Sequence, residues 1–135
     1  MTLVEVVMAL AITGLTVAGI VSGYVYCTTA AVKAELAQAA NAKALERIEE
    51  TRSAIWAPDR ASPVDQLVAT NFPDEVVTLD LPGTNSAGTS ATIQTLITPI
   101  SSSPPIRRIR VDCIWQFRGV ELVTNSIETC RAADQ

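Results

Sequence analysis

The chain opens with the stretch Met1-Thr2-Leu3-Val4-Glu5, and Glu5 is followed by a long run that has no charge. This run is mostly apolar and extends over 27 residues, from Val6 to Val32. A helix needs about 20 apolar residues to cross the hydrocarbon core of a bilayer. The stretch therefore predicts an apolar helix that spans a membrane or is buried against other helices, and the rest of the fold depends on it.

Glu5 is the one residue of this region that needs a chemical explanation. A carboxylate at membrane depth costs about 2.5–3.5 kcal/mol on insertion scales, so we expect Glu5 to have a partner. The apolar run that follows offers none. A secretory signal peptide is the alternative interpretation, but its apolar core spans only about 7–15 residues and follows a basic start. The length of the run favours a retained anchor.

The opening residues resemble the amino terminus of mature type IV pilins and type II secretion pseudopilins. In that family an apolar residue, usually Phe, precedes Thr-Leu-apolar-Glu and a long apolar helix; here the match is Met1-Thr2-Leu3-Val4-Glu5. The resemblance implies that a prepilin peptidase removes a basic leader and that Met1 is then N-methylated. It also implies that Glu5 meets the free amine of a neighbouring subunit during filament assembly.

Small residues recur through the apolar run at helical spacing. Gly14, Ala18 and Ser22 share one stripe, and Gly19 and Gly23 form a second. Helices in lipid associate through such faces, because small side chains let two backbones approach closely. We therefore expect these residues to pack neighbouring helices together.

One continuous helix is predicted from about Thr2 to Trp56. Tyr24 and Tyr26 stand where the apolar run would leave a bilayer, as in an interfacial aromatic belt. Strong helix formers dominate the following residues up to Ala57, and Pro58 ends the helix. An apolar face is expected at Ala37, Ala40, Ala44, Ile48 and Ile55, and i,i+3 ion pairs are expected between Lys43 and Glu46, Arg47 and Glu50, and Glu49 and Arg52.

The remaining residues predict a small antiparallel sheet, so the expected class is α+β. The sheet would lie on the C-terminal half of the helix, which is the pilin architecture. Strands are expected at Val76–Leu81, Thr92–Thr98, Ile106–Phe117 and Val120–Ile127, with loops at Pro82–Ser90 and Pro99–Pro105. The expected regions are an apolar helix at 1–27, its amphipathic continuation at 28–57, a connecting loop at 58–75 and the sheet region at 76–135.

The strand Ile106–Phe117 shows the clearest alternation. Ile109, Val111, Cys113, Trp115 and Phe117 are expected on its apolar face, with Arg108, Arg110, Asp112 and Gln116 on the other. Arg118-Gly119 predicts a two-residue hairpin loop that pairs Phe117 with Val120 and Trp115 with Leu122. This register would place Val120 and Leu122 on the apolar face.

Three cysteines allow one disulfide, which we expect between Cys113 and Cys130 in an oxidising compartment. Because the predicted register puts Thr124 opposite Cys113, this bond requires the chain to turn back after Ile127. Cys27 is expected to be a small buried apolar residue.

Two charged clusters are candidates for contacts between subunits. The basic one is Arg107, Arg108 and Arg110, and the acidic one is Glu46, Glu49 and Glu50. We expect no nucleic-acid partner, because the net charge is −4 and phosphate-driven binding needs more than three cations.

The sequence offers no basis for catalysis. The chain has no His, so the commonest general base and metal ligand is missing. Cys27 has no His partner, and the scattered acidic residues lack the Asp-x-Asp-x-Asp spacing of a calcium loop. We therefore expect no enzyme activity, no metal and no cofactor.

Together these features predict a structural subunit of a type IV pilus or a closely related helical filament. The resemblance implies a bacterial inner-membrane pool, an assembly machinery and a homopolymer on the cell surface. A minor pilin or a type II secretion pseudopilin is the alternative within the family, and abundance in sheared surface filaments would separate the two. A monomeric membrane-tethered binding domain is the alternative of another class, and for it a Glu5→Ala change should leave surface display intact.

Overall fold

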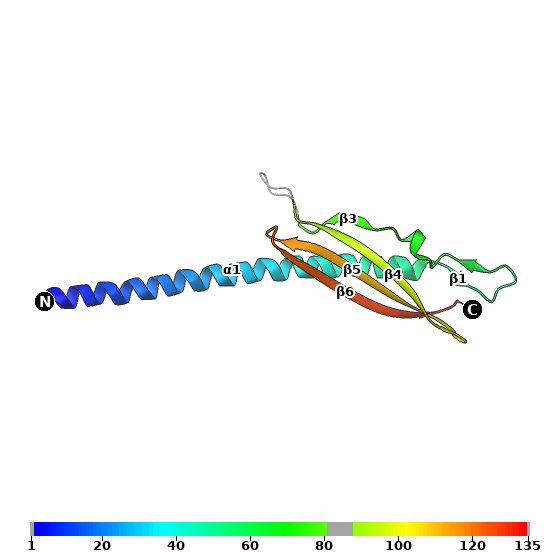
Figure 1. Cartoon of the computed structure of the whole chain (residues 1–135), viewed down its shortest axis with the longest axis horizontal. Helices are drawn as coiled ribbons and strands as arrows, with labels where there is room; N and C mark the ends of the chain where they lie inside the picture. Colours follow the sequence, from blue (N-terminus) through cyan, green and yellow to red (C-terminus); the bar gives the residue numbers. More distant parts are fainter. Residues whose placement is uncertain (1, 81–87, 135) are drawn as a thin grey trace. The chain divides into compact units, whose positions relative to one another are not determined.

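The computed structural model of the chain describes residues 2–80 and 88–134. One helix, α1 (Leu3–Ser53), precedes the strands (Figure 1). The other elements are β1 (Trp56–Ala57), β2 (Val64–Asp65), a 3-10 helix η1 (Ala69–Asn71), β3 (Glu75–Thr78), β4 (Ser90–Ser102), β5 (Pro105–Phe117) and β6 (Glu121–Ala132). The predicted α+β class is confirmed. The chain divides between Glu35 and Leu36 into two compact units, which are described separately.

The helix ends at Ser53, so its predicted extension to Trp56 is wrong. Trp56 instead pairs with Asp65 in a two-stranded ribbon and is buried. Burial of this large side chain outweighs local helix propensity, which is a weak preference. Arg131 donates a 2.7 Å hydrogen bond to the Thr51 carbonyl oxygen, and this contact satisfies one of the unpaired carbonyls at the helix end.

In the unit that begins at Leu36, the helix packs against a four-stranded antiparallel sheet of order β3-β4-β5-β6. The predicted apolar face of β5 is confirmed, since all five of its residues from Ile109 to Phe117 are buried. The helix contributes Leu36, Ala40, Ala44 and Ile48 to the same core. Ala40 and Ala44 are fully buried, and their small size lets the helix approach the sheet closely. Ile55 lies beyond the helix and is exposed.

The strands β4 and β5 are longer than predicted. They extend through most of the expected loop at 99–105 and leave only Ser103 and Pro104 between them. Pro99 lies beyond the residues of β4 that pair with β3, and beside an irregularity in the β4–β5 register; edges and bulges are where strands tolerate proline. Most of the other expected loop, Pro82–Ser90, lies outside the described residues.

The predicted register of the last hairpin is wrong by one residue on β6. Phe117 pairs with Glu121, and Trp115 pairs with Val123, so Val120 is a third loop residue. Because successive side chains of a strand point to opposite faces, this shift moves every side chain of β6 to the face opposite the predicted one. Val120 and Leu122 are therefore exposed, whereas Val123 and Ile127 pack against the core.

The structure also contradicts the predicted disulfide. Cys113 lies opposite Asn125, and β6 continues without turning back to Ala132. Cys130 is therefore five residues away along β6, or about 16 Å, and it points to the other face. All three cysteines are free thiols; Cys113 is buried and Cys130 exposed, and Cys27 is exposed rather than buried as expected.

The free thiols lead to a labelling prediction. We expect iodoacetamide to modify Cys130 in the native chain and to leave Cys113 unmodified until the chain unfolds. Burial blocks access to Cys113 and raises the pKa of its thiol, and the thiolate is the reactive form. Mass spectrometry of peptides from native and denatured protein measures this difference. Recovery of a Cys113–Cys130 cross-linked peptide without reductant would show that the predicted disulfide does form.

Candidate functional site

Glu5 lies in the first turn of α1, where it forms a capping box with Thr2. The Thr2 backbone N–H donates to Glu5 Oε2 at 2.9 Å, and the Glu5 backbone N–H donates to Thr2 Oγ1 at 3.4 Å. Such reciprocal bonds satisfy donors at a helix start that would otherwise be unpaired. Thr2 is thus a partner that the sequence analysis missed, although the Thr-x-x-Glu spacing was visible. Met1 lies outside the described residues.

The groups of Thr2 that bond to the Glu5 carboxylate in the capping box are uncharged. A carboxylate near a helix amino terminus gains only about 0.3–1 kcal/mol from the helix dipole at an exposed site. Among the described residues up to Glu35, the first cation is Lys33. It lies 28 residues along the helix, which is about 42 Å at 1.5 Å per residue. Glu5 therefore has a structural role at the start of its own helix, and residues 2–35 place no cation near its carboxylate.

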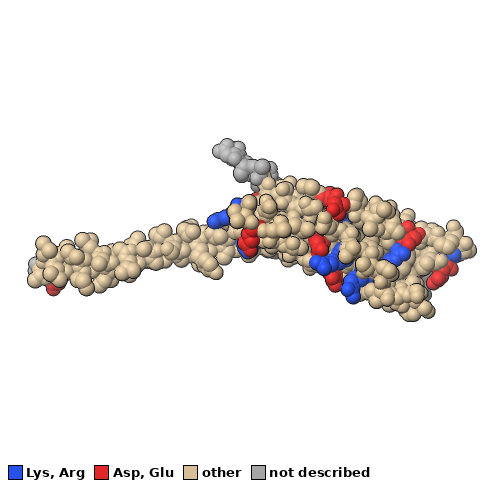
Figure 2. Space-filling model, viewed as in Figure 1, with Lys and Arg blue, Asp and Glu red and all other residues tan. Residues whose placement is uncertain are grey.

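The first unit exposes nearly all of its apolar surface. Its helix is long and apolar enough to cross a membrane, and no part of its most apolar window is buried within the chain. Figure 2 shows this stretch almost free of charged side chains beyond the acid at its start. The large exposed apolar residues include Leu3, Met8, Leu10, Ile12, Leu15 and Ile20. Such a surface is compatible with insertion into a membrane.

The predicted small-residue stripe forms part of a shallow groove on this helix. Gly14, Ala18 and Ser22 line it together, flanked by larger apolar side chains. A Cβ atom added at Gly14, Gly19 or Gly23 would meet no atom within 4 Å. Glycine inside a helix costs about 1 kcal/mol relative to alanine. Nothing within the described chain requires these glycines.

The acidic cluster forms ion pairs within its own helix, and the predicted i,i+3 pairs are confirmed. Glu46, Glu49 and Glu50 accept from Lys43 at 2.7 Å, Arg52 at 2.8 Å and Arg47 at 2.9 Å, respectively. The hydrogen bond between Lys43 and Glu46 raises the pKa of the lysine and lowers the pKa of the carboxyl. The pairs Lys43–Glu46 and Glu49–Arg52 are exposed and contribute little to stability, whereas Arg47 is buried.

The structure does not bring the three arginines of the basic cluster together. Arg107 lies on the helix side of the sheet, 4.4 Å above the Trp56 ring, and holds Asp65 through two hydrogen bonds of 2.6 and 2.7 Å. Arg108 and Arg110 point to the opposite face. Arg110 pairs with Asp112 at 2.8 Å, whereas Arg108 is exposed and has no ionic partner among residues 2–80 and 88–134.

The ion pair between Arg107 and Asp65 leads to a prediction of acid sensitivity. Hydrogen bonds from Arg107 hold the pKa of Asp65 below its usual value, against the opposing effect of desolvation. The stabilisation is therefore present above the ordinary Asp pKa of about 3.9 and is lost as the pH falls through the lower folded pKa. We expect Asp65→Asn to lower the urea midpoint at neutral pH, with the difference from wild type shrinking below about pH 4. A difference that stays constant with pH would contradict this.

Sequence reasoning predicted the pair of Arg47 and Glu50 but missed two long-range polar contacts in the core region. Arg47 is buried on the helix and is held by Glu50 and by Glu75 of β3. Trp115 donates to Asn125 at 2.9 Å, and Asn125 donates to Asn41 of the helix at 3.1 Å. Both networks fix the helix on the sheet, and each joins segments far apart in sequence.

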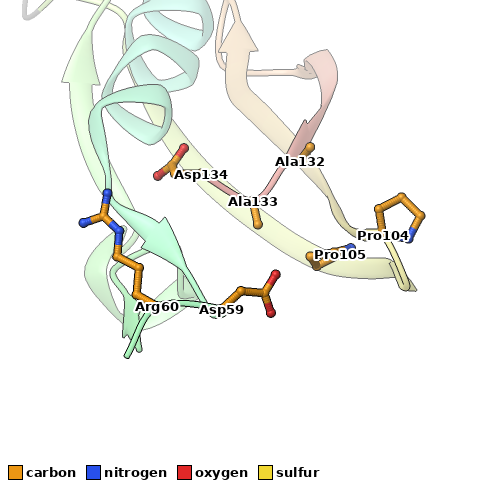
Figure 3. A pocket seen from close by; sticks show the side chains of 7 residues that line it. All are labelled: Asp59, Arg60, Pro104, Pro105, Ala132, Ala133 and Asp134. Carbon is orange, nitrogen blue, oxygen red and sulfur yellow. The ribbon is translucent and has the colours of Figure 1, made fainter. Parts of the chain in front are cut away.

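A cavity of about 400 Å³ lies at one end of the second unit. Figure 3 shows its lining from the β1–β2 connection, the β4–β5 turn and the chain end: Asp59, Arg60, Pro104, Pro105, Ala132, Ala133 and Asp134. Asp134 is already bonded to the Trp56 backbone N–H at 2.8 Å and to Arg131. No group of three or more metal-ligating side chains occurs among the described residues. The cavity therefore combines an apolar lining of prolines and alanines with the charged side chains of Asp59, Arg60 and Asp134.

Comparisons of the chain with protein-family models, curated proteins and solved structures give no match.

Proposed function

We propose that the chain is a structural subunit of a type IV pilus or a closely related helical filament. In this proposal the apolar helix holds the subunit in the bacterial inner membrane. The subunit is then extracted into a homopolymer on the cell surface, and the helices of neighbouring copies pack together in its core. The proposal assigns the chain no catalytic step, metal or cofactor.

The observation that carries the proposal is the exposed apolar segment at the start of α1, which has a single acid in its first turn. Lipid alone would satisfy the apolar side chains, but it would not neutralise the carboxylate. A neighbouring copy supplies both an apolar surface and, at its own amino terminus, a cation. The free amine of the next Met1 is the proposed partner of Glu5, which agrees with the resemblance of the opening residues to pilins.

The glycines support the same proposal. Gly14, Gly19 and Gly23 weaken an isolated helix, and nothing within 4 Å of their positions explains their presence. They are explained if a second helix lies against them, because small residues permit close approach of two backbones.

Isolation of surface filaments tests the proposal. Cells that process and export the full-length chain are sheared, and the released fraction is examined by electron microscopy and intact-mass spectrometry. We expect filaments composed mainly of this chain, with one methyl group on the Met1 amine. Cells that display the chain only as a membrane-bound monomer would support a tethered binding domain, and traces of the chain in filaments of another subunit would support a minor pilin or pseudopilin.

A further inference from the structure

The turn between β5 and β6 presents two apolar side chains to solvent. Val120 is 89% exposed and Leu122 is 66% exposed. Arg118 and Gly119 both have positive φ and reverse the chain direction, so Val120 stands in the loop rather than in the sheet. A single exposed apolar residue is ordinary in a folded protein. This pair is informative because of the end of the second unit at which it lies.

Contacts inside the second unit show at which end the turn lies. Asn125 on β6 bonds to Asn41 of the helix, and Arg131, further along β6, bonds to Thr51. The strand β6 therefore runs in the same direction as this part of the helix. The turn before Glu121 consequently lies at the Leu36 end of the unit, as Figure 1 shows. The chain reaches Leu36 directly from the apolar segment, whose last uncharged residue is Val32.

We propose that the turn of Val120 and Leu122 rests on the surface of the phospholipid bilayer while the apolar helix is anchored in it. This inference depends on the membrane stage of the proposed function. Apolar side chains at an interface insert about 5–10 Å into the boundary between headgroups and acyl chains. The bilayer is the expected partner of the turn because the membrane anchor joins the second unit at the same end as the turn. The opposite end carries the cavity lined by Asp59, Arg60 and Asp134.

The charges beside the turn are compatible with this location. Arg118 lies 5.5 Å above the Phe117 ring, and Glu121 follows at the start of β6. The two charges balance, so we expect the contact to form on zwitterionic phosphatidylcholine and to need no anionic lipid. The apolar side chains, rather than a cationic patch, provide the attraction.

Quenching by brominated lipid tests the contact in the full-length chain. The native Trp56 and Trp115 are buried, so wild type supplies a constant background. Val120→Trp is reconstituted in phosphatidylcholine vesicles with bromine near the headgroups. The matched control is Ser102→Trp, an exposed position in the β4–β5 hairpin at the other end of the unit. We expect loss of the added emission for Val120→Trp and none for Ser102→Trp.

Vesicle flotation, measured on the same samples, separates failure of the anchor from failure of the contact. If the chain does not float with vesicles, the membrane stage and this inference both fail. If it floats but the two tryptophans are quenched equally, or neither is quenched, only the inference fails. A change in Val120→Trp emission that depends on protein concentration and not on bromine would assign the turn to a second copy. In Leu122→Trp, adding Val120→Asp should reduce the quenching; unchanged quenching would also overturn the inference.

Discussion

A Glu5→Gln variant should lose filament assembly while keeping the start of its helix intact. Glutamine can replace glutamate in a capping box, so the bonds to Thr2 are retained. The negative charge is lost, and the amine proposed to meet it remains unpaired in an apolar surrounding. Removing one member of a buried ion pair costs about 3–5 kcal/mol, and each 1.4 kcal/mol is a tenfold change in association. We therefore expect the yield of sheared filaments to fall at least about tenfold.

Thr2→Ala is the matched control for this experiment. It removes the hydroxyl of the capping box and keeps the Glu5 carboxylate, at a cost of about 0.5–2 kcal/mol to the helix start. We expect this variant still to form filaments, with a modest loss of yield. Immunoblots of the membrane and sheared fractions measure both variants at equal expression. If Thr2→Ala abolished assembly and Glu5→Gln did not, Glu5 would act only as a helix cap.

Trp115→Ala should cause the largest loss of stability in the second unit. Its side chain is 1% exposed, contacts Phe117 edge to face at a centroid distance of 6.2 Å, and donates to Asn125. Truncation would leave a cavity and would remove the bond that orients Asn125 toward Asn41. Trp→Ala changes in cores cost about 3–5 kcal/mol, a large part of the stability of a small domain.

Gln116→Ala is the neighbouring control, since Gln116 lies on the exposed face of the same strand. We expect it to change stability by less than about 0.5 kcal/mol. Urea unfolding in detergent micelles, followed by circular dichroism in the strand and helix bands, gives both midpoints. Similar midpoints for the two variants would mean that the sheet does not bury Trp115 against the helix.

The parts of the fold that were predicted correctly are a strand and a helix face, because the apolar residues of each repeat with the period of that element. The alternation from Ile109 to Phe117 predicted a strand with one buried face, and Ala40, Ala44 and Ile48 predicted the face of the helix that covers it. Both patterns depend only on local geometry and on which side faces the core. For the same reason the i,i+3 ion pairs were predicted correctly.

The errors arose where one residue of register decides the outcome. Arg118 and Gly119 mark a turn, but their identity does not determine whether Val120 belongs to the loop or to the strand. With Val120 in the loop, every β6 side chain changes face, and Cys113 stands opposite Asn125. The disulfide was inferred from cysteine number and compartment, and neither of these determines the distance between two thiols.

The candidate site was only partly predictable. The unusual acid of the apolar run was evident from composition. The Thr-x-x-Glu spacing, which is the local signature of its capping bond with Thr2, was also present in the sequence but was not used. The bond between Arg47 and Glu75 joins residues 28 positions apart, so no local pattern reveals it. Such long-range pairs depend on the finished packing of helix and sheet.

A helical reconstruction of the filament by electron cryo-microscopy tests the central claim most directly. The account predicts that the helices of neighbouring copies touch along Gly14, Ala18 and Ser22, and that the Glu5 carboxylate lies within about 4 Å of a neighbouring Met1 amine. A reconstruction in which Glu5 faces water, or in which the apolar helices do not touch one another, would contradict it.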